Sequence, residues 1–196
     1  TLKLNGSSSG SVSIDAPAST TIPSGGADVT LTLPQSGFNI PEYDAWVITS
    51  NFTTDSSSPD YFTSNWQRLD VDNSLFSKIG TGMTESSGVF SFPSTGYWQI
   101  NGQWNIDSNS VTDTNVLGTI YATHNNSTYT MAGRCSCSTT GGEKFTIATE
   151  FLLDVTDTSN VKVKFASDSS NGVIFLGEHT TGAMKTGVIF KKIGET

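Results

Sequence analysis

The side chains that most often carry out catalysis are scarce in this chain of 196 residues, which contains two histidines. His124 and His179 both lie in segments whose composition is typical of loops. A serine or cysteine nucleophile needs a histidine beside it and a third group that orients the histidine. With 28 serines in the chain, some serine will lie near a histidine by chance. We therefore predict no catalytic residues and expect that the protein is not an enzyme.

The two cysteines, Cys135 and Cys137, lie two positions apart. On a strand, residues at this spacing point to the same face, and a disulfide between them would be strained. A closed zinc site needs three or four ligands, and two thiols with two distant histidines are too few. We therefore interpret both cysteines as free thiols.

Carboxylates in turn-like segments are the better candidates for a metal, because Ca²⁺ prefers oxygen ligands. Asp and Asn are also the residues that turns prefer for their own backbone hydrogen bonds. We favour this second interpretation and predict no cofactor, with calcium as the alternative. The carboxylates concerned form three pairs in the sequence: Asp55 with Asp60, Asp70 with Asp72, and Asp107 with Asp113.

The charge of the chain excludes several classes of partner. The formal net charge is −8 and only 14% of the residues are charged, with one dense basic run at Lys191 and Lys192. Nucleic acids are bound through clustered Lys and Arg, so we expect no nucleic-acid partner. No apolar run approaches the roughly 20 residues that span a bilayer, and the first residues lack the apolar stretch of a signal peptide. We expect no membrane insertion and no cleaved leader.

Small hydroxyl residues and glycine dominate the composition, with 28 Ser, 28 Thr and 19 Gly. Ser and Gly are weak helix formers, whereas Thr and the aromatic residues suit strands. From about residue 38 onwards apolar and polar residues alternate with a period of two, most clearly in residues 98–106. We predict an all-β domain over residues 38–196, with about eight strands in a β-sandwich.

Residues 1–37 differ from the rest of the chain. Their short alternating runs are separated by Ser- and Gly-rich turn segments, at residues 6–10 and 23–26. The alternating runs predict three short strands, and three such strands hold too little apolar surface to be stable alone in water. We predict a β-rich N-terminal arm that packs on the following domain, on copies of itself or on a partner.

The segment at residues 88–100 narrows the choice among β-sandwich folds. In it, two inward aromatic residues end one strand, and a corner that contains Pro93 and Gly96 leads into the next strand. Its pattern resembles the most recognisable stretch of the jelly rolls of the complement-q globular-head and tumour-necrosis-factor families. The resemblance covers about residues 40–196, with weaker matches at residues 150–163 and 186–190. The matching positions of the main motif are Gly88, Phe90, Pro93, Gly96, Trp98 and Ile100.

The resemblance implies a ten-stranded jelly roll that assembles as a tight homotrimer, for binding or as a structural cap without catalysis. Aromatic residues with a polar tip are enriched at subunit contacts, so exposed tyrosines and strands that are apolar on both faces are candidates for the interface. The same residues would equally fit the core of the second sheet. The four candidates are Tyr121, Tyr129, Ile189 and Phe190.

The N-terminal segment points to a class of protein. Residues 4–18 and 29–34 resemble short β-modules in tail-fibre and other surface proteins of bacteriophages, and residues 79–88 resemble proteins of marine tailed phages. The Gly-x-x repeat of a collagen-like stalk is missing from residues 1–37. The resemblance implies a structural protein of the virion surface that is assembled in the bacterial cytoplasm. It would be a capsid decoration or a short fibre head, docked to other virion proteins by its arm.

Three alternatives stay open. The first is the receptor-binding tip of a tail fibre that recognises a host glycan or a host surface protein. The second is a secreted trimeric ligand or lectin-like module. The third is a fibre-borne glycan hydrolase, which needs a carboxylate pair at a defined separation that nothing in the sequence marks.

Overall fold

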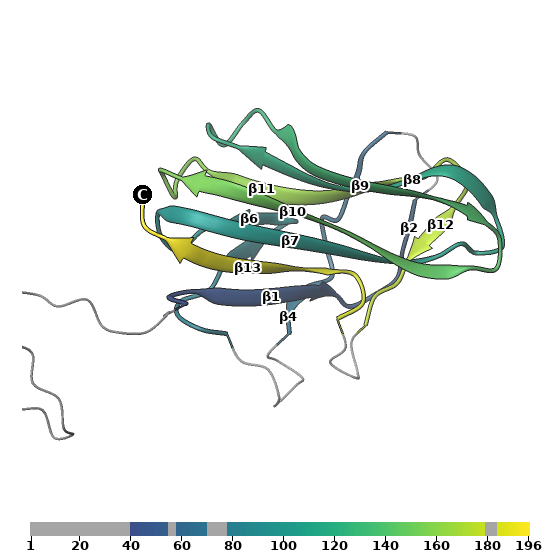
Figure 1. Cartoon of the computed structure of the whole chain (residues 1–196), viewed down its shortest axis with the longest axis horizontal. Helices are drawn as coiled ribbons and strands as arrows, with labels where there is room; N and C mark the ends of the chain where they lie inside the picture. Colours follow the sequence, from purple (N-terminus) through teal and green to yellow (C-terminus); the bar gives the residue numbers. More distant parts are fainter. Residues whose placement is uncertain (1–39, 55–57, 70–77, 179–183) are drawn as a thin grey trace, which may run out of the picture. The chain divides into compact units, whose positions relative to one another are not determined.

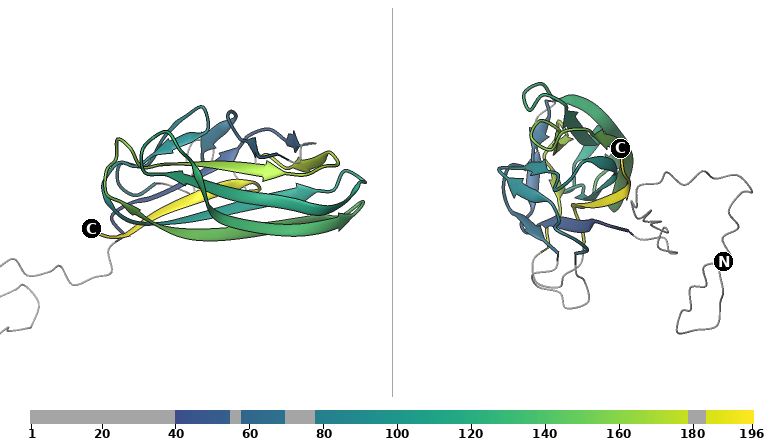
Figure 2. Two further views of the ribbon diagram at one scale, coloured as in Figure 1. Left: turned by 90° about the horizontal axis from the view of Figure 1, so that it is seen from above. Right: turned by 90° about the vertical axis from the view of Figure 1, so that its left-hand side faces the viewer.

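The computed structural model of the chain describes residues 40–54, 58–69, 78–178 and 184–196. Within these ranges the chain forms thirteen strands, and none of the described residues is helical, so no helix there could cross a membrane. The strands form two antiparallel sheets that pack as a sandwich (Figure 1; Figure 2). The predicted all-β sandwich is therefore confirmed. The predicted arm at residues 1–37 lies outside the described residues, as do His179, Asp55, Asp70 and Asp72.

Sheet A contains seven of the described strands. Its strand order is β2-β12-β7-β13-β1-β4, and β10 pairs with β7 in addition. The strands are β1 (Tyr43–Ile48), β2 (Phe52–Thr54), β4 (Trp66–Arg68), β7 (Gly96–Asp107), β10 (Lys144–Val155), β12 (Val173–Phe175) and β13 (Gly187–Gly194).

Sheet B lies opposite, with the order β5-β6-β11-β8-β9 and with β3 paired to β11. Its strands are β3 (Asp60–Tyr61), β5 (Thr84–Ser86), β6 (Val89–Ser91), β8 (Thr112–Thr123), β9 (Thr130–Thr140) and β11 (Lys162–Asp168). The chain passes from β9 in sheet B to β10 in sheet A through a turn at Gly141 and Gly142, both with positive φ. Strands β9 and β10 therefore border one long side of the sandwich.

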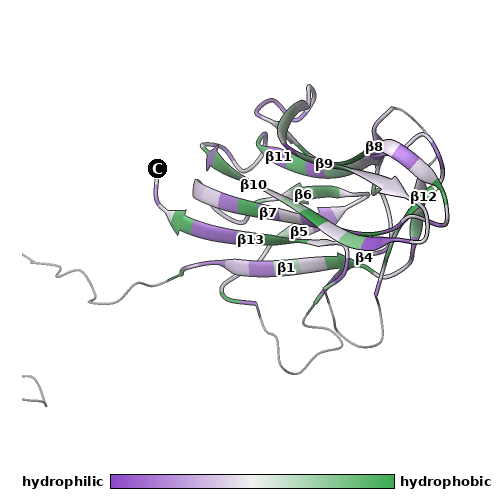
Figure 3. Ribbon diagram, turned by 45° about the vertical axis from the view of Figure 1, so that its right-hand side comes forward, coloured by the Kyte–Doolittle hydropathy of each residue, from purple (hydrophilic) through white to green (hydrophobic). Residues whose placement is uncertain are grey.

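The alternation in residues 98–106 has the predicted effect, because Trp98, Ile100, Trp104 and Ile106 are all buried between the sheets. Hydrophilic and hydrophobic positions alternate visibly along β7 (Figure 3). Trp104 lies against Gly118 of the opposite sheet, where a Cβ atom would be 2.3 Å from the indole ring. Only glycine leaves room for this indole.

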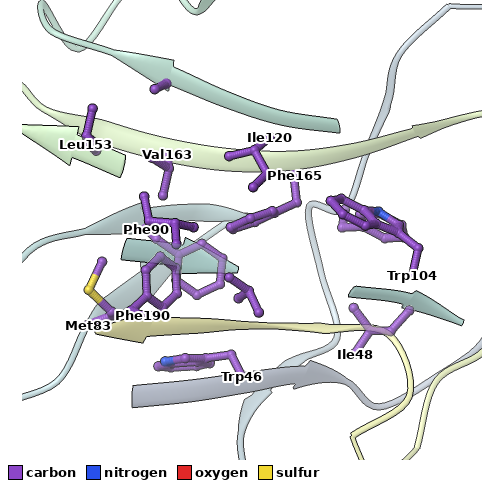
Figure 4. Packing of buried hydrophobic residues seen from close by; sticks show 14 of the residues in the cluster. Trp46, Ile48, Met83, Phe90, Trp104, Ile120, Leu153, Val163, Phe165 and Phe190 are labelled. Atoms are coloured by element: carbon purple, nitrogen blue, oxygen red, sulfur yellow. The ribbon is translucent and has the colours of Figure 1, made fainter. Parts of the chain in front are cut away.

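The centre of the core is aromatic, as Figure 4 shows for part of the cluster. The Phe90 ring has T-shaped contacts with the rings of Trp46, Trp66 and Phe165, with centroids 5.1–5.5 Å apart. Phe190 is fully buried and its ring centroid lies 5.2 Å from that of Phe90. The assignment of Phe190 to the subunit interface is therefore corrected: its side chain fills the core, which was the alternative at sequence level.

The jelly-roll motif forms the crossing from sheet B to sheet A. Ser87 and Gly88 make the two-residue turn between β5 and β6 with positive φ, as hairpins of this length require. A Cβ on Gly88 would lie 2.2 Å from the carbonyl oxygen of Phe62, so the position needs glycine. After Pro93, the indole Nε1 of Trp98 donates to the carbonyl of Ser94 at 3.2 Å. Gly96 has a φ of 133° where β7 begins.

Candidate interaction surfaces

The outer surface of sheet A, called face A below, is rich in amides. Gln99, Asn101, Gln103 and Asn105 alternate with the buried residues of β7 and are half-buried. The Nε2 atom of Gln99 donates to Glu150 at 2.9 Å, and the Nδ2 atom of Asn105 donates to Thr146 at 2.7 Å. These hydrogen bonds tie β7 to β10 on the outer side of the sheet.

One end of face A is apolar and uncovered. Tyr97, Leu152 and Ile193 expose 40%, 55% and 44% of their surface. The strand register places Tyr97 opposite Asp154 of β10 and Gly194 of β13, and places Leu152 opposite Gln99. The side chains of Tyr97, Leu152 and Ile193 therefore lie together at the end of face A where β7 begins. Figure 3 shows the hydrophobic tip of β13 at this end. Neighbouring exposed apolar side chains are typical of an interaction surface.

Two further residues belong to face A. Ile189, one of the four predicted interface residues, pairs with Ala45 and Asn101 and is half-buried. Asp154 is half-buried, and its Oδ1 atom is buried without a hydrogen-bond partner. A buried oxygen of this kind normally has a donor.

The side of the sandwich that β9 and β10 border, called the edge below, is also apolar. Among the described strands β9 pairs only with β8 and β10 only with β7, and β9 and β10 contact each other without ladder hydrogen bonds, with Gly133 of β9 against Thr149 of β10. The inward side chains of these two strands pack on the core but stay partly exposed. They are Ala132, Cys135, Cys137, Phe145, Ile147 and Phe151.

The two cysteines of the edge are free thiols, as their spacing predicted. Burial raises the pKa of both Cys135 and Cys137 to about 11. The Cys135 thiol donates to the carbonyl of Gly118 at 3.5 Å. Protonated thiols are weak nucleophiles and weak metal ligands, so the two side chains act here as small apolar residues. No group of three or more His, Cys, Asp or Glu side chains suited to a metal occurs among the described residues.

The outer surface of sheet B, called face B below, carries three tyrosines. The Nζ atom of Lys164 lies 3.6 Å from the ring centroid of Tyr61 and 4.2 Å from that of Tyr129. The ring of Tyr121 meets that of Tyr61 in a T-shaped contact at 5.4 Å. Tyr121 and Tyr129, both predicted as interface residues, therefore lie on face B, whereas Ile189 lies on face A.

The centre of face B is buried beneath these side chains. Ala166 pairs with Tyr61 on one side and with Thr119 on the other, and both Ala166 and Thr119 have no exposed surface. Asp168 is 7% exposed. The Oγ1 atom of Thr119 and the Oδ1 atom of Asp168 are buried without a partner. Burial raises the pKa of Asp168 above its ordinary value, Arg134 opposes the rise and Asp60 adds to it.

Asp113 is also a buried carboxylate, but unlike Asp168 it accepts hydrogen bonds on both of its oxygens. Its Oδ2 accepts hydrogen bonds from Ser169 at 2.7 Å and from the Ser170 amide at 2.8 Å, and its Oδ1 accepts one from the Asn115 amide at 2.9 Å. Burial raises the pKa of Asp113, but these donors outweigh burial and the pKa lies below its ordinary value. Its carboxylate therefore joins the start of β8 to the residues that follow β11.

The other described acids that were candidates for calcium also have partners within the chain. Asp60 accepts a hydrogen bond from Thr54 at 2.7 Å, and Asp107 pairs with Lys144 at 3.0 Å and accepts from the Asn109 amide. The turn interpretation accounts for these acids, and the calcium alternative stays untested. His124 is exposed in the turn between β8 and β9.

The sequence did contain a signal for face A that alternation alone does not capture. Phe151, Leu152 and Leu153 are three consecutive apolar residues, which makes β10 apolar on both faces. Face B has no comparable signal. The charge of its buried carboxylate, Asp168, acts on Tyr61 and Tyr121, and Arg134 acts on Asp168, although these three residues come from three strands that are distant in sequence.

Comparison with known proteins supports the fold. No protein-family model and no curated protein matches the sequence. Murine APRIL at pH 5.0 superposes with a TM-score of 0.55 at 12% identity, over 77% of this chain and 98% of that chain. Eiger TNF from S. frugiperda gives 0.49 at 11% identity, over 80% and 95% of the two chains. The PRD1 vertex protein P5 gives 0.46 at 17% identity, over 80% and 99%. The superposition on murine APRIL agrees with the two-sheet architecture and shows that the described domain has a TNF-like jelly-roll fold.

Proposed function

We propose that this chain is a non-catalytic structural protein of a bacteriophage particle, in which three copies of the jelly roll assemble and the N-terminal segment attaches them to other virion proteins. The observation that carries the assembly is the presence of two different apolar surfaces on one domain, of which one is exposed and the other is partly exposed. These are the end of face A around Leu152 and the edge around Phe145 and Phe151.

Two different surfaces favour a closed ring over a twofold pair. In a twofold dimer the same patch contacts itself, whereas a contact between two different patches repeats from copy to copy and closes when the rotation allows. In the proposed assembly, face A of one copy covers the edge of the next. The jelly-roll motif around Phe90 and Trp98 resembles families whose jelly rolls form trimers, and this supports a ring of three.

Burial of these surfaces supplies the driving force. Each Å² of apolar surface removed from water contributes about 25 cal/mol. The exposed parts of the large apolar side chains at the end of face A contribute no burial energy while they face solvent. A neighbouring copy would also bring a donor within reach of the unpartnered Oδ1 of Asp154, which lies opposite Tyr97 in the register.

The role in a phage particle is supported by the N-terminal segment. Residues 4–18 and 29–34 resemble β-modules of phage fibre and surface proteins. The low content of charged residues, 14%, and the many Ser and Thr side chains suit a surface that resists non-specific adhesion. We place the protein on the virion surface, as a capsid decoration or a short fibre head.

Immunogold labelling of intact particles tests this role. Antibodies raised against the full chain should label every particle, and the position of the gold separates capsid from tail. Antibody that has first been adsorbed with the purified chain is the control and should give no label. Particles that lack label, while the chain is detected free in the same lysate, would contradict the structural role.

A further inference from the structure

A lysine of β13 carries a buried ammonium. The side chain of Lys192 turns inward, opposite the buried Trp98, and only 6% of it is exposed. An ammonium removed from water needs an anion and hydrogen-bond acceptors, because the burial of an unpaired charge is costly. The Nζ atom donates to Oε1 and Oε2 of Glu195 at 2.9 and 2.8 Å, and to Oγ of Ser94 at 3.2 Å. The carboxylate that compensates the buried charge therefore comes from the residue that follows β13.

The corner of the jelly-roll motif leaves room for this lysine. A Cβ atom on Gly96 would lie 2.4 Å from Cε of Lys192 and 2.5 Å from the carbonyl oxygen of Gly194. The missing side chain of Gly96 therefore lets both the lysine stem and the end of β13 lie against the corner. Figure 1 shows the end of β13 beside the start of β7. Ser94 joins the two parts, because its carbonyl accepts from the indole of Trp98 and its hydroxyl accepts from Lys192.

The ion pair closes a short bend of the chain around Ile193 and Gly194. The side chain of Glu195 is 75% exposed, and its carboxylate reaches back across these two residues to Lys192. The strand register shifts between Lys192 and Gly194, which makes Ile193 an extra residue at this point. Ile193 is exposed, and Gly194 pairs with Tyr97. The ion pair therefore fixes the bend that brings Ile193 to the apolar end of face A.

A fixed position of Ile193 matters for an apolar contact between copies. Residues at the end of a strand open easily unless other contacts hold them. Each residue that becomes ordered only when two copies meet loses backbone entropy at that moment. A surface that is ordered beforehand avoids this loss and binds more tightly. The bend at Ile193 is therefore a place where a contact within one chain can set the affinity between chains.

We propose that Lys192 and Glu195 form an ionic clasp that holds Ile193 in position for the neighbouring copy. Both are positioning residues, because the clasp acts through Ile193 and neither partner needs to touch the neighbour. The purpose of the clasp rests on the proposed assembly. The clasp itself is built within one chain, so its existence is tested without the assembly.

The order of the bend in single chains tests the clasp. Single chains are obtained by dilution, or with Leu152→Asp, which places a charge in the apolar end of face A. Lys192→Met removes the ammonium and keeps an apolar stem, whereas Glu195→Gln removes the charge of its partner. Backbone ¹⁵N relaxation should show Ile193 and Gly194 as rigid as the rest of β13 in the chain with an intact clasp. Both residues should be mobile on the nanosecond scale in the two clasp variants.

The assembly of Lys192→Met and Glu195→Gln tests the purpose of the clasp. In sedimentation equilibrium, the concentration at which half of the chains are assembled should rise about tenfold for both variants, because ordering one residue on binding costs about that factor. Glu178→Gln is the matched control. It weakens the ion pair of 2.9 Å between Lys185 and Glu178, which precedes β13 at its other end, and should assemble as the unchanged chain does.

Two results would overturn the inference. One is unchanged order of Ile193 and Gly194 in both clasp variants. The other is loss of order without any change in assembly, which would make the clasp a purely local contact. An unchanged chain that stays single at every concentration would instead contradict the proposed assembly, while loss of order in the variants would still support the clasp. If Lys192→Met does not fold, Glu195→Gln decides the question, since the side chain of Glu195 is exposed.

Discussion

Face A and face B are the two outer surfaces of one sandwich, and both are formed by the outward residues of alternating strands. They differ in which outward side chains remain exposed to solvent. Face A leaves Leu152 and Tyr97 uncovered at one end. Face B covers its own centre with Tyr61 and Tyr121 and keeps a buried carboxylate without a donor. The difference indicates that the apolar side chains of face A are accessible to a neighbouring copy, whereas the carboxylate of face B is shielded within the chain.

A charge placed in the apolar end of face A should have the largest effect. Leu152→Asp would bury an uncompensated charge between copies, which costs about 3–5 kcal/mol. We expect the assembly to dissociate into single chains at micromolar concentration, measured by sedimentation velocity. Thr84→Asp places the same charge on an exposed strand of sheet B and should leave the assembly intact. Dissociation in both variants, or in neither, would remove the distinction between the two faces.

The two buried carboxylates allow a second test, by stability. Asp113→Asn replaces an oxygen that accepts two hydrogen bonds and should lower the free energy of unfolding by about 1–3 kcal/mol. Asp168→Asn removes a charge that has no donor and should leave stability unchanged or raise it. Urea unfolding of both variants measures the difference. Equal losses would mean that Asp168 is held as firmly as Asp113.

The core could be predicted from the sequence because it depends on alternation within one strand. Trp98, Ile100 and Trp104 are separated by two and by four positions, which are even spacings, and all face inward. Phe190 shows where this reasoning ends. It belongs to an apolar run, Val188–Phe190, in which neighbouring residues on both faces are apolar, so the sequence does not tell which residue faces the core.

The clusters on the outer faces depend on which strands become neighbours. Lys164 meets Tyr61 and Tyr129 because β3 pairs with β11 and the turn after β8 lies near them. Strand order and register follow from the packing of the whole domain, and periodicity within a strand contains no information about them. The tyrosines were recognised at sequence level as exposed aromatics, but their common surface was not.

The pH dependence of stability gives a smaller effect with a defined sign. Because the folded state raises the pKa of Asp168, the folded state holds this proton more tightly than the unfolded chain does. The contribution of Asp168 to stability is therefore lost as pH rises from about 4 through its folded pKa. Asp113, with a lowered pKa, has the opposite sign and stabilises the fold above about pH 4.

Unfolding of the unchanged chain and of Asp168→Asn, measured from pH 3 to pH 7, isolates this term. The stability of the variant relative to the unchanged chain should increase as pH rises and then level off. A difference that decreases with pH would show that Asp168 has found a donor in solution.

The smallest expected effect is a change in the rate at which the two thiols of the edge react. With a pKa of about 11, Cys135 and Cys137 should react slowly with a disulfide reagent at pH 8, and faster as pH rises. In Leu152→Asp the edge loses its neighbour, so the reaction at a fixed pH should be roughly a few-fold faster. Equal rates in the assembled and dissociated forms would place the subunit contact away from the edge.

The native mass of the full chain in solution tests the central claim most directly. Each chain has a mass of 20.8 kDa. If face A of one copy covers the edge of the next in a closed ring of three, sedimentation equilibrium at micromolar concentration should give the mass of three chains. The mass of a single chain would contradict the assembly, and the mass of two chains would contradict the ring.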